Sequence, residues 1–123
     1  MNTEILYKDI TDKIIKCFYK VYDELGSGFL ESVYEKSLMI ELKDIGLKAD
    51  NQRSLNVYYK NQLVGDFKVD IIVEDKIIIE IKAVTKLTAQ HEAQIINYLK
   101  ATGIKVGLLV NFGDELEFKR RIF

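Results

Sequence analysis

Two acidic side chains and a lysine lie within strongly apolar stretches of the sequence, where side chains are expected to be buried. Glu80 interrupts the run Ile77–Ile81, whose other four residues are isoleucine, and Lys82 follows it by two positions. Asp70 lies in the similar stretch Val69–Val73. Burying a carboxylate costs several kcal/mol unless it is paired or binds a metal ion. These three residues are therefore the first candidates for a functional site.

The length of the loop between the two stretches decides whether the carboxylates can meet. If they form an antiparallel hairpin, a two-residue turn pairs Asp70 with Ile79 and puts the two carboxylates on opposite faces. A three-residue loop, Glu74–Lys76, pairs Asp70 with Glu80 instead. Lys82 then lies on the face of Glu80, because side chains alternate along a strand. A shared site thus predicts the three-residue loop.

Oxygen ligands from Asp70 and Glu80 would suit Mg²⁺ or Mn²⁺. Such an ion polarises a phosphoryl oxygen and lowers the pKa of a bound water. Lys82 would then orient the attacking water or stabilise the charge that develops on the phosphate. The alternative is an internal ion pair between Lys82 and a carboxylate at the end of a strand. The residues alone leave both interpretations open.

The surrounding sequence predicts the elements that position these residues. Gly46 and Gly103 are placed to end helices in the left-handed conformation, Thr88 to cap one, and Gly65 to kink a strand. The predicted order is α-α-β-β-β-α-β-β, with helices at about 5–25, 30–45 and 89–102 and strands at about 54–59, 62–73, 77–81, 105–111 and 115–123. This order favours an α/β fold of the α+β type, with a mixed central sheet flanked by helices.

Length and composition limit the possible functions. The 123 residues fit a single domain, 1–123, and the net charge of −1 does not by itself predict tight nonspecific binding to nucleic acid. The single cysteine, Cys17, allows no intramolecular disulfide and is expected to be buried, and the single histidine, His91, excludes a zinc site built from several histidines of one chain. No apolar run is long enough to span a membrane, so a cytoplasmic protein is expected.

The spacing of the polar residues resembles a known superfamily. Asp70, nine intervening residues and then Glu80-Ile81-Lys82 resemble the PD-(D/E)XK nucleases, although no proline precedes Asp70. The segment Gly28–Tyr34, with Glu31 between, is similar to the motif of the GxxExxY proteins, which are grouped in that superfamily. The likeness covers nearly the whole chain from about residue 14. It implies a restriction-endonuclease-like core.

The resemblance also implies roles for individual residues. It assigns Asp70, Glu80 and the carbonyl of Ile81 to a metal site that Glu31 completes, and Lys82 to catalysis. Residues 94–98 resemble the Gln-x-x-x-Tyr motif of some DNA-end-processing members, which adds Gln94 and Tyr98 as supporting residues.

Helical spacing gives further residues of the same segments a possible part in the site. His91, Gln94 and Tyr98 share one helix face, from which Gln94 could orient Lys82 or Glu80. The expected substrate-binding residues are Gly28, Tyr34, Lys86 and His91. Each has a plainer interpretation: Glu31 as a helix N-terminal charge, Tyr34 as a core residue with a bonded hydroxyl, His91 as an early-helix polar residue, and Lys86 with 119–121 as a solvated basic edge.

The leading hypothesis is a Mg²⁺- or Mn²⁺-dependent nuclease that hydrolyses phosphodiester bonds, with DNA favoured over RNA. The alternative is a non-catalytic module for nucleic-acid binding or protein assembly that keeps the nuclease fold. A nuclease that acts only within a larger complex is a third hypothesis. Edge strands and the aromatic residues Phe112 and Phe123, expected to be exposed, favour a homodimer.

Overall fold

The order of elements agrees with the prediction. A computed structural model describes residues 6–123. Its elements are α1 (Lys8–Leu25), α2 (Glu31–Asp44), β1 (Ala49–Tyr59), β2 (Gln62–Val73), β3 (Ile77–Lys82), α3 (Ala89–Thr102), β4 (Val106–Phe112) and β5 (Leu116–Ile122). The predicted strand at 54–59 therefore begins five residues earlier, and the first helix begins at Lys8, while the predicted start at Ile5 lies outside the described residues.

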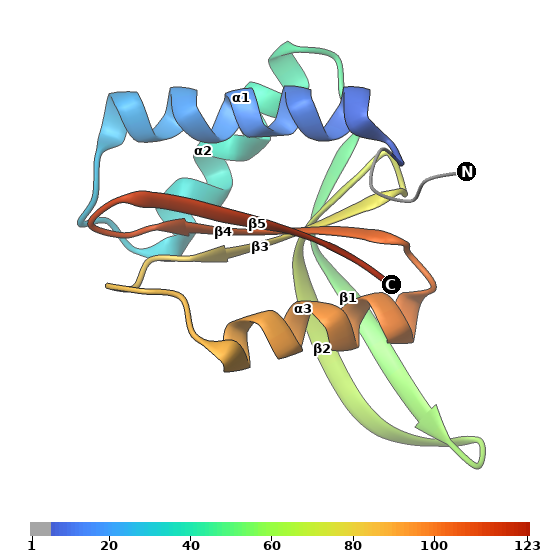
Figure 1. Ribbon diagram of the computed structural model, residues 1–123. Helices are drawn as coiled ribbons and strands as arrows, with labels where there is room; N and C mark the ends of the chain where they lie inside the picture. Colours follow the sequence, from blue (N-terminus) through green and yellow to red (C-terminus); the bar gives the residue numbers. More distant parts are fainter. Residues whose placement is uncertain (1–5) are drawn as a thin grey trace.

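The five strands form one mixed sheet in the order β1-β2-β3-β4-β5. Neighbouring strands are antiparallel except β3 and β4, which run parallel and are connected through α3. Helices α1 and α2 cover one face of the sheet and α3 covers the other (Figure 1). This three-layer arrangement confirms the predicted fold class.

Burial on both faces explains the isoleucine-rich third strand. Ile77, Ile79 and Ile81 pack in the cluster beneath α1 and α2, where Cys17 is also buried as expected. Ile78 packs on the opposite face against α3. Side chains that alternate between two covered faces produce a continuous apolar run, so Glu80, on the α3 side, is the exception in this strand.

The loop between β2 and β3 has the predicted three residues. Val73 pairs with Ile77, and the ladder continues to Ile71 and Ile79. Glu74 and Asp75 both adopt positive φ angles, and the Lys76 N–H donates to the Val73 carbonyl at 2.9 Å. The register therefore brings Asp70 opposite Glu80, as a shared site requires.

One exposed aromatic residue was predicted wrongly. Phe112 is 1% exposed and its ring stacks on that of Tyr34, with centroids 4.5 Å apart. It is the last residue of β4, and alternation points its ring toward α1 and α2, whereas the predicted strand ended one residue earlier, at Asn111. Phe123 is exposed, as expected.

None of the helices within residues 6–123 combines the length and the apolar character needed to cross a membrane.

Close packing at Gly107 holds α3 against the sheet. A Cβ atom at Gly107 would lie 2.8 Å from Cδ1 of Ile95, a fully buried residue of α3. We therefore expect Gly107→Ala to lower the free energy of unfolding by about 1–3 kcal/mol through overpacking. Ile95→Ala removes both atoms that would clash, Cδ1 and Cγ1, so the double variant should be more stable than the sum of the single changes predicts. Urea unfolding of the four proteins in this cycle measures the coupling, and additive effects would contradict the packing argument.

Candidate metal and catalytic site

Asp70 and Glu80 lie where β2 and β3 separate. The regular ladder between these strands ends at the pair Ile71 and Ile79. Beyond it, the Asp70 N–H donates to Oε1 of Glu80 at 3.1 Å, and the Ile81 N–H donates to Oδ2 of Asp70 at 2.7 Å. Each carboxylate thus accepts a backbone amide of the opposite strand in place of a ladder bond. The arrangement fixes both side chains at the opening between the strands.

Two carboxylates so close together and so little exposed resist ionisation. Glu80 is 3% exposed, and burial raises its pKa to about 8, with the nearby charge of Asp70 contributing further. Burial also raises the pKa of Asp70, although the hydrogen bond from Ile81 opposes this shift. Glu80 therefore holds its proton at neutral pH unless a cation compensates the pair.

Two oxygen atoms at this opening are available to a ligand. Oε2 of Glu80 has no protein hydrogen-bond partner within residues 6–123. Every fully buried side-chain oxygen of that region does have a partner, so Oε2 must be accessible from outside. The carbonyl of Ile81 points toward Asp70, because the N–H and C=O of one strand residue point to the same side and this N–H bonds Asp70. The donor set is therefore oxygen only, which suits Mg²⁺ or Mn²⁺.

Acidic residues of α2 approach the pair from the side. The charges of Glu35 and Glu31 both raise the pKa of Asp70, and Glu31 also raises that of Glu80. Gln52, on β1, donates to Glu35 at 2.6 Å and to Asp70 at 3.3 Å, with its backbone at a φ of 53°. Sequence analysis predicted Glu31 but missed Glu35 and Gln52. Glu35 lies one helical turn after Glu31, and that spacing was the available signal.

No group of three or more acidic, histidine or cysteine side chains is close enough to hold a metal ion within the part of the chain described here. Among the described residues, Asp70 and Glu80 are the two acidic residues whose carboxylates accept backbone amides across the opening between β2 and β3. Mg²⁺ is commonly bound through one or two carboxylates, with waters and substrate phosphates supplying the remaining ligands. A two-carboxylate arrangement is therefore compatible with that ion.

A buried asparagine, to which the sequence analysis gave no role, fixes the chain just after Lys82. Asn111 pairs with Lys82 across β3 and β4, and its amide forms two hydrogen bonds of 2.9 Å with the backbone N–H and C=O of Val84. A Cβ at Gly113 would lie 2.0 Å from the Val84 carbonyl, so only glycine allows this approach. Asn111 is the one polar side chain in β4, and this anomaly was the available signal. Lys86 is exposed in the loop that follows β3.

The two motif residues of α3 are bonded to each other. Nε2 of Gln94 donates to the hydroxyl of Tyr98 at 3.1 Å. Tyr98 packs in the cluster that contains Val69 and Ile78, close to the carboxylate pair on the α3 face. Burial raises its pKa, and the charge of Glu80 raises it further. The bond from Gln94 to Lys82 or Glu80 that the sequence predicted does not occur among the bonds of the described residues. His91 instead caps α3, because its Nδ1 accepts the Thr88 N–H at 3.0 Å.

Tyr34 and Gly28 organise the entry to α2. Tyr34 is fully buried, and its hydroxyl donates to the Gly26 carbonyl at 2.7 Å and accepts the Phe29 N–H at 3.2 Å. Tyr34 therefore has no exposed surface for the substrate contact expected from the sequence and corresponds to the plainer interpretation, a core residue. Gly28 is exposed, with a φ of 108° that favours glycine.

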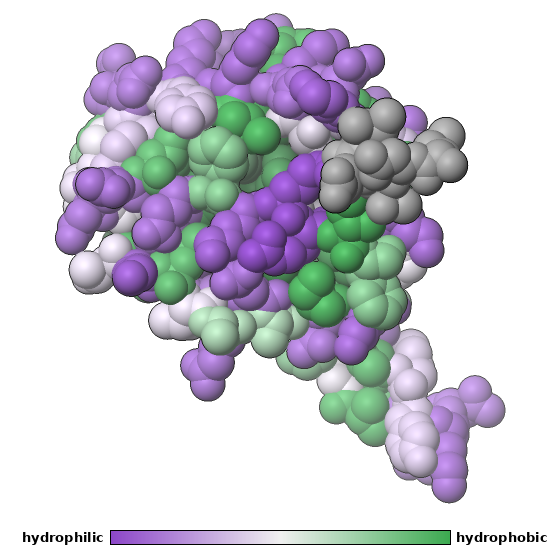
Figure 2. Space-filling model, viewed as in Figure 1, coloured by the Kyte–Doolittle hydropathy of each residue, from purple (hydrophilic) through white to green (hydrophobic). Residues whose placement is uncertain are grey.

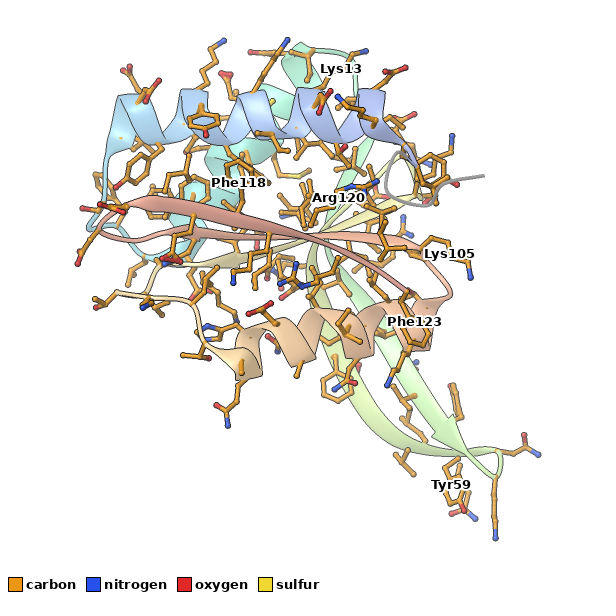
Figure 3. The ribbon with its side chains drawn as sticks, in the orientation of Figure 1. Lys13, Tyr59, Lys105, Phe118, Arg120 and Phe123 are labelled. Atoms are coloured by element: carbon orange, nitrogen blue, oxygen red, sulfur yellow. The ribbon has the colours of Figure 1, made fainter. Side chains whose placement is uncertain are left out.

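The basic residues near the C-terminus are engaged with the protein. Lys119 and Arg121 of β5 both pair with Glu92 of α3, the former at 3.3 Å. Arg120 donates to the Leu6 carbonyl, and Figure 3 shows it on β5 between the sheet and α1. These contacts use the basic edge, residues 119–121, to hold the layers together, and binding of phosphate there stays a prediction.

Comparison with known proteins agrees with this geometry. The family model described as the PD-(D/E)XK nuclease superfamily matches residues 8–122, and so includes the separated strands with their carboxylates. The chain belongs to the PD-(D/E)XK nuclease superfamily. No curated protein matches it.

The fold of this PD-(D/E)XK protein is similar to that of a solved structure. The crystal structure of SSO0001 aligns with a TM-score of 0.59 at 19% sequence identity, covering 74% of this chain and 48% of that one. This chain therefore spans about half the length of that protein. At this identity the likeness concerns the fold alone.

The raised pKa of Glu80 predicts a pH-dependent stability in metal-free solution. The folded state holds a proton with a pKa of about 8 that the unfolded chain releases near 4.5, so the free energy of unfolding should fall as pH rises through this window. Glu80→Gln keeps the oxygen that accepts from Asp70 but cannot ionise. We expect this variant to gain stability over the wild type by a few kcal/mol toward alkaline pH, since one pKa unit corresponds to about 1.4 kcal/mol. Urea unfolding in EDTA at both ends of the window tests this, and parallel pH profiles would contradict it.

Asn111 gives a second stability prediction. Asn111→Ala leaves the Val84 N–H and C=O without partners, so the free energy of unfolding should decrease by about 1–3 kcal/mol. Asn56→Ala, at an exposed position of β1, is the matched control and should have no measurable effect. Equal stability of the two variants would show that the clamp on the loop after Lys82 is unimportant.

Proposed function

We propose that residues 1–123 form a single cytoplasmic domain that hydrolyses phosphodiester bonds of nucleic acid with Mg²⁺ or Mn²⁺. The observation that carries this proposal is the pair Asp70 and Glu80, held by reciprocal bonds at the opening between β2 and β3, with Lys82 on the same face as Glu80. The preference for DNA over RNA and the assignment to the GxxExxY branch rest on the sequence resemblance. Association into a homodimer or a larger complex stays a prediction.

In this proposal the metal ligands are Asp70, Glu80 and the Ile81 carbonyl, with Glu31 completing the set through a water molecule. The raised pKa of Glu80 supports this assignment, because Glu80 is buried beside Asp70 and the nearby charge of Lys82 offsets the rise only in part. Glu35 holds Gln52 against Asp70 and so acts as a positioning residue. The bound ion would polarise a phosphoryl oxygen and lower the pKa of a bound water.

The remaining roles fall to groups on the α3 face. Lys82 would place its ammonium beside the phosphate and stabilise the negative charge that develops during attack. Lys82 forms no ion pair within residues 6–123, although its charge lowers the pKa of Glu80, so its ammonium group is available for this role. Tyr98, oriented by Gln94, would donate a hydrogen bond from its hydroxyl group to a phosphate oxygen near Glu80.

Cleavage assays test the proposal. With Mg²⁺ or Mn²⁺, the wild type should cleave at least one of single-stranded DNA, duplex DNA and RNA, and EDTA should stop the reaction. Asp70→Asn and Glu80→Gln keep the acceptors for the backbone amides, so both should fold, yet each should lose essentially all activity. Lys82→Ala should lower kcat by about 100- to 1000-fold, the usual loss when a group that stabilises developing charge is removed.

Asp66→Asn is the matched control, because Asp66 is an exposed carboxylate of the same strand, four residues from Asp70. It should leave cleavage unchanged. Full activity in Asp70→Asn or Lys82→Ala would refute the assigned roles. Nucleic-acid binding that needs no metal, persists in Glu80→Gln and leads to no cleavage would instead favour the non-catalytic module.

A further inference from the structure

The hairpin of β1 and β2 extends beyond the sheet and faces α3. Figure 1 shows the two strands leaving the layered core beside α3, and Figure 2 shows apolar side chains along this projection. Val69 packs with the α3 cluster, whereas Ile71 packs on the other face, so β2 rolls over at Asp70. The hairpin therefore begins at the candidate metal site and leads away from it along α3.

A cavity of about 600 Å³ lies between this hairpin and α3. Its size is within the range of small-molecule sites. The hairpin side is apolar, with Leu55, Val57 and Phe67, and the α3 side carries the carboxamides of Gln94 and Asn97. Gln94 and Tyr98 belong to both the cavity and the candidate active site, so the two are continuous.

Two aromatic rings form the walls of this cavity. The ring of Phe67 lies over Gly65, where an added Cβ would be only 2.8 Å from its Cε2 atom. Its centroid is 6.0 Å from that of Tyr98, with the rings inclined at 50°. Phe67 is nevertheless 44% exposed, so much of its surface is available to a ligand. Lys100 also lines the cavity and adds a positive charge, with its ammonium 5.4 Å from the ring centroid of Phe123.

Flat apolar walls, carboxamides and a nearby cation match the chemistry of a nucleotide. Aromatic side chains stack on any base, carboxamides hydrogen-bond base edges, and lysine pairs with phosphate. A base that is stacked and paired within a duplex cannot enter such a cavity without leaving the helix, which costs a few kcal/mol. The cavity therefore favours an unpaired base.

We propose that the cavity between the hairpin and α3 binds an unpaired nucleobase next to the bond to be cleaved, so that the substrate is single-stranded nucleic acid or an unpaired end. This inference rests on the proposed nuclease function and specifies its substrate class. Phe67 supplies the stacking surface, and Tyr98 links the bound base to the carboxylate pair.

Binding of labelled oligonucleotides tests this proposal. Fluorescence anisotropy is measured in Ca²⁺, which occupies oxygen sites, with the probe checked for integrity afterwards. The probes are a single-stranded oligodeoxynucleotide, its duplex, and an abasic strand of the same length that keeps the phosphates. The wild type should bind the single strand most tightly. Phe67→Ala should weaken that binding by roughly 5- to 150-fold, the value of one stacked base, and leave the abasic strand unaffected.

Tyr59→Ala is the control, because Tyr59 is an exposed aromatic residue at the hairpin tip, remote from the cavity (Figure 3). It should bind as the wild type does. Equal affinity for the abasic strand, no single-strand binding by the wild type, or an unchanged Phe67→Ala variant would each overturn the inference. Self-association that Phe67→Ala abolishes, without single-strand binding, would assign the cavity to a second copy of the chain and also overturn it.

The two proposals fail differently. Single-strand binding through Phe67 with no cleavage in Mg²⁺ or Mn²⁺ would support the base site and contradict the nuclease. Duplex cleavage that depends on Asp70 and is unchanged in Phe67→Ala would support the nuclease and contradict the base site.

Discussion

The burial of Glu80 beside a second carboxylate, Asp70, is the constraint on which the rest of the site depends. Asp70 and Glu80 stay close only because each accepts a backbone amide of the other's strand, where the ladder between β2 and β3 has ended. These bonds hold the pair in place, but burial, followed by the charge of Asp70, still raises the pKa of Glu80 to about 8, against the lowering effect of Lys82. A divalent cation would remove this penalty, which links the local strand geometry to the proposed metal chemistry.

The three layers serve to keep that opening rigid. From one side, α2 brings Glu35, whose partner Gln52 reaches Asp70. From the other, α3 packs Tyr98 beside the pair, and Asn111 fixes the chain just after Lys82. Helices on both faces of a mixed sheet therefore do more than bury the isoleucine-rich strand. They deliver the polar groups of the site from segments far apart in the sequence.

The sequence predicted the features that depend on neighbouring residues, namely loop length, strand register and helix caps. The odd loop length placed Asp70 opposite Glu80, because side chains alternate along strands, and the cap at Thr88 was evident from its position before an apolar helix. Other roles depended on tertiary contacts. His91 is used by that cap, and Tyr34 by the core. The cavity was also not predictable, because it lies beyond the point where the hairpin rolls over, at Gln52 of β1 and Asp70 of β2, and a φ of 53° at Gln52 has no sequence signal.

Titration of Mn²⁺ into the metal-free protein by calorimetry tests the central claim most directly, because it requires no knowledge of the substrate. The account predicts saturable binding to the wild type above the pKa of Glu80, about 8. Binding should be unchanged in Asp66→Asn and lost in folded Asp70→Asn. Mn²⁺ binding that is equal in the wild type and Asp70→Asn, or absent from the folded wild type, would contradict a metal site at the opening between β2 and β3.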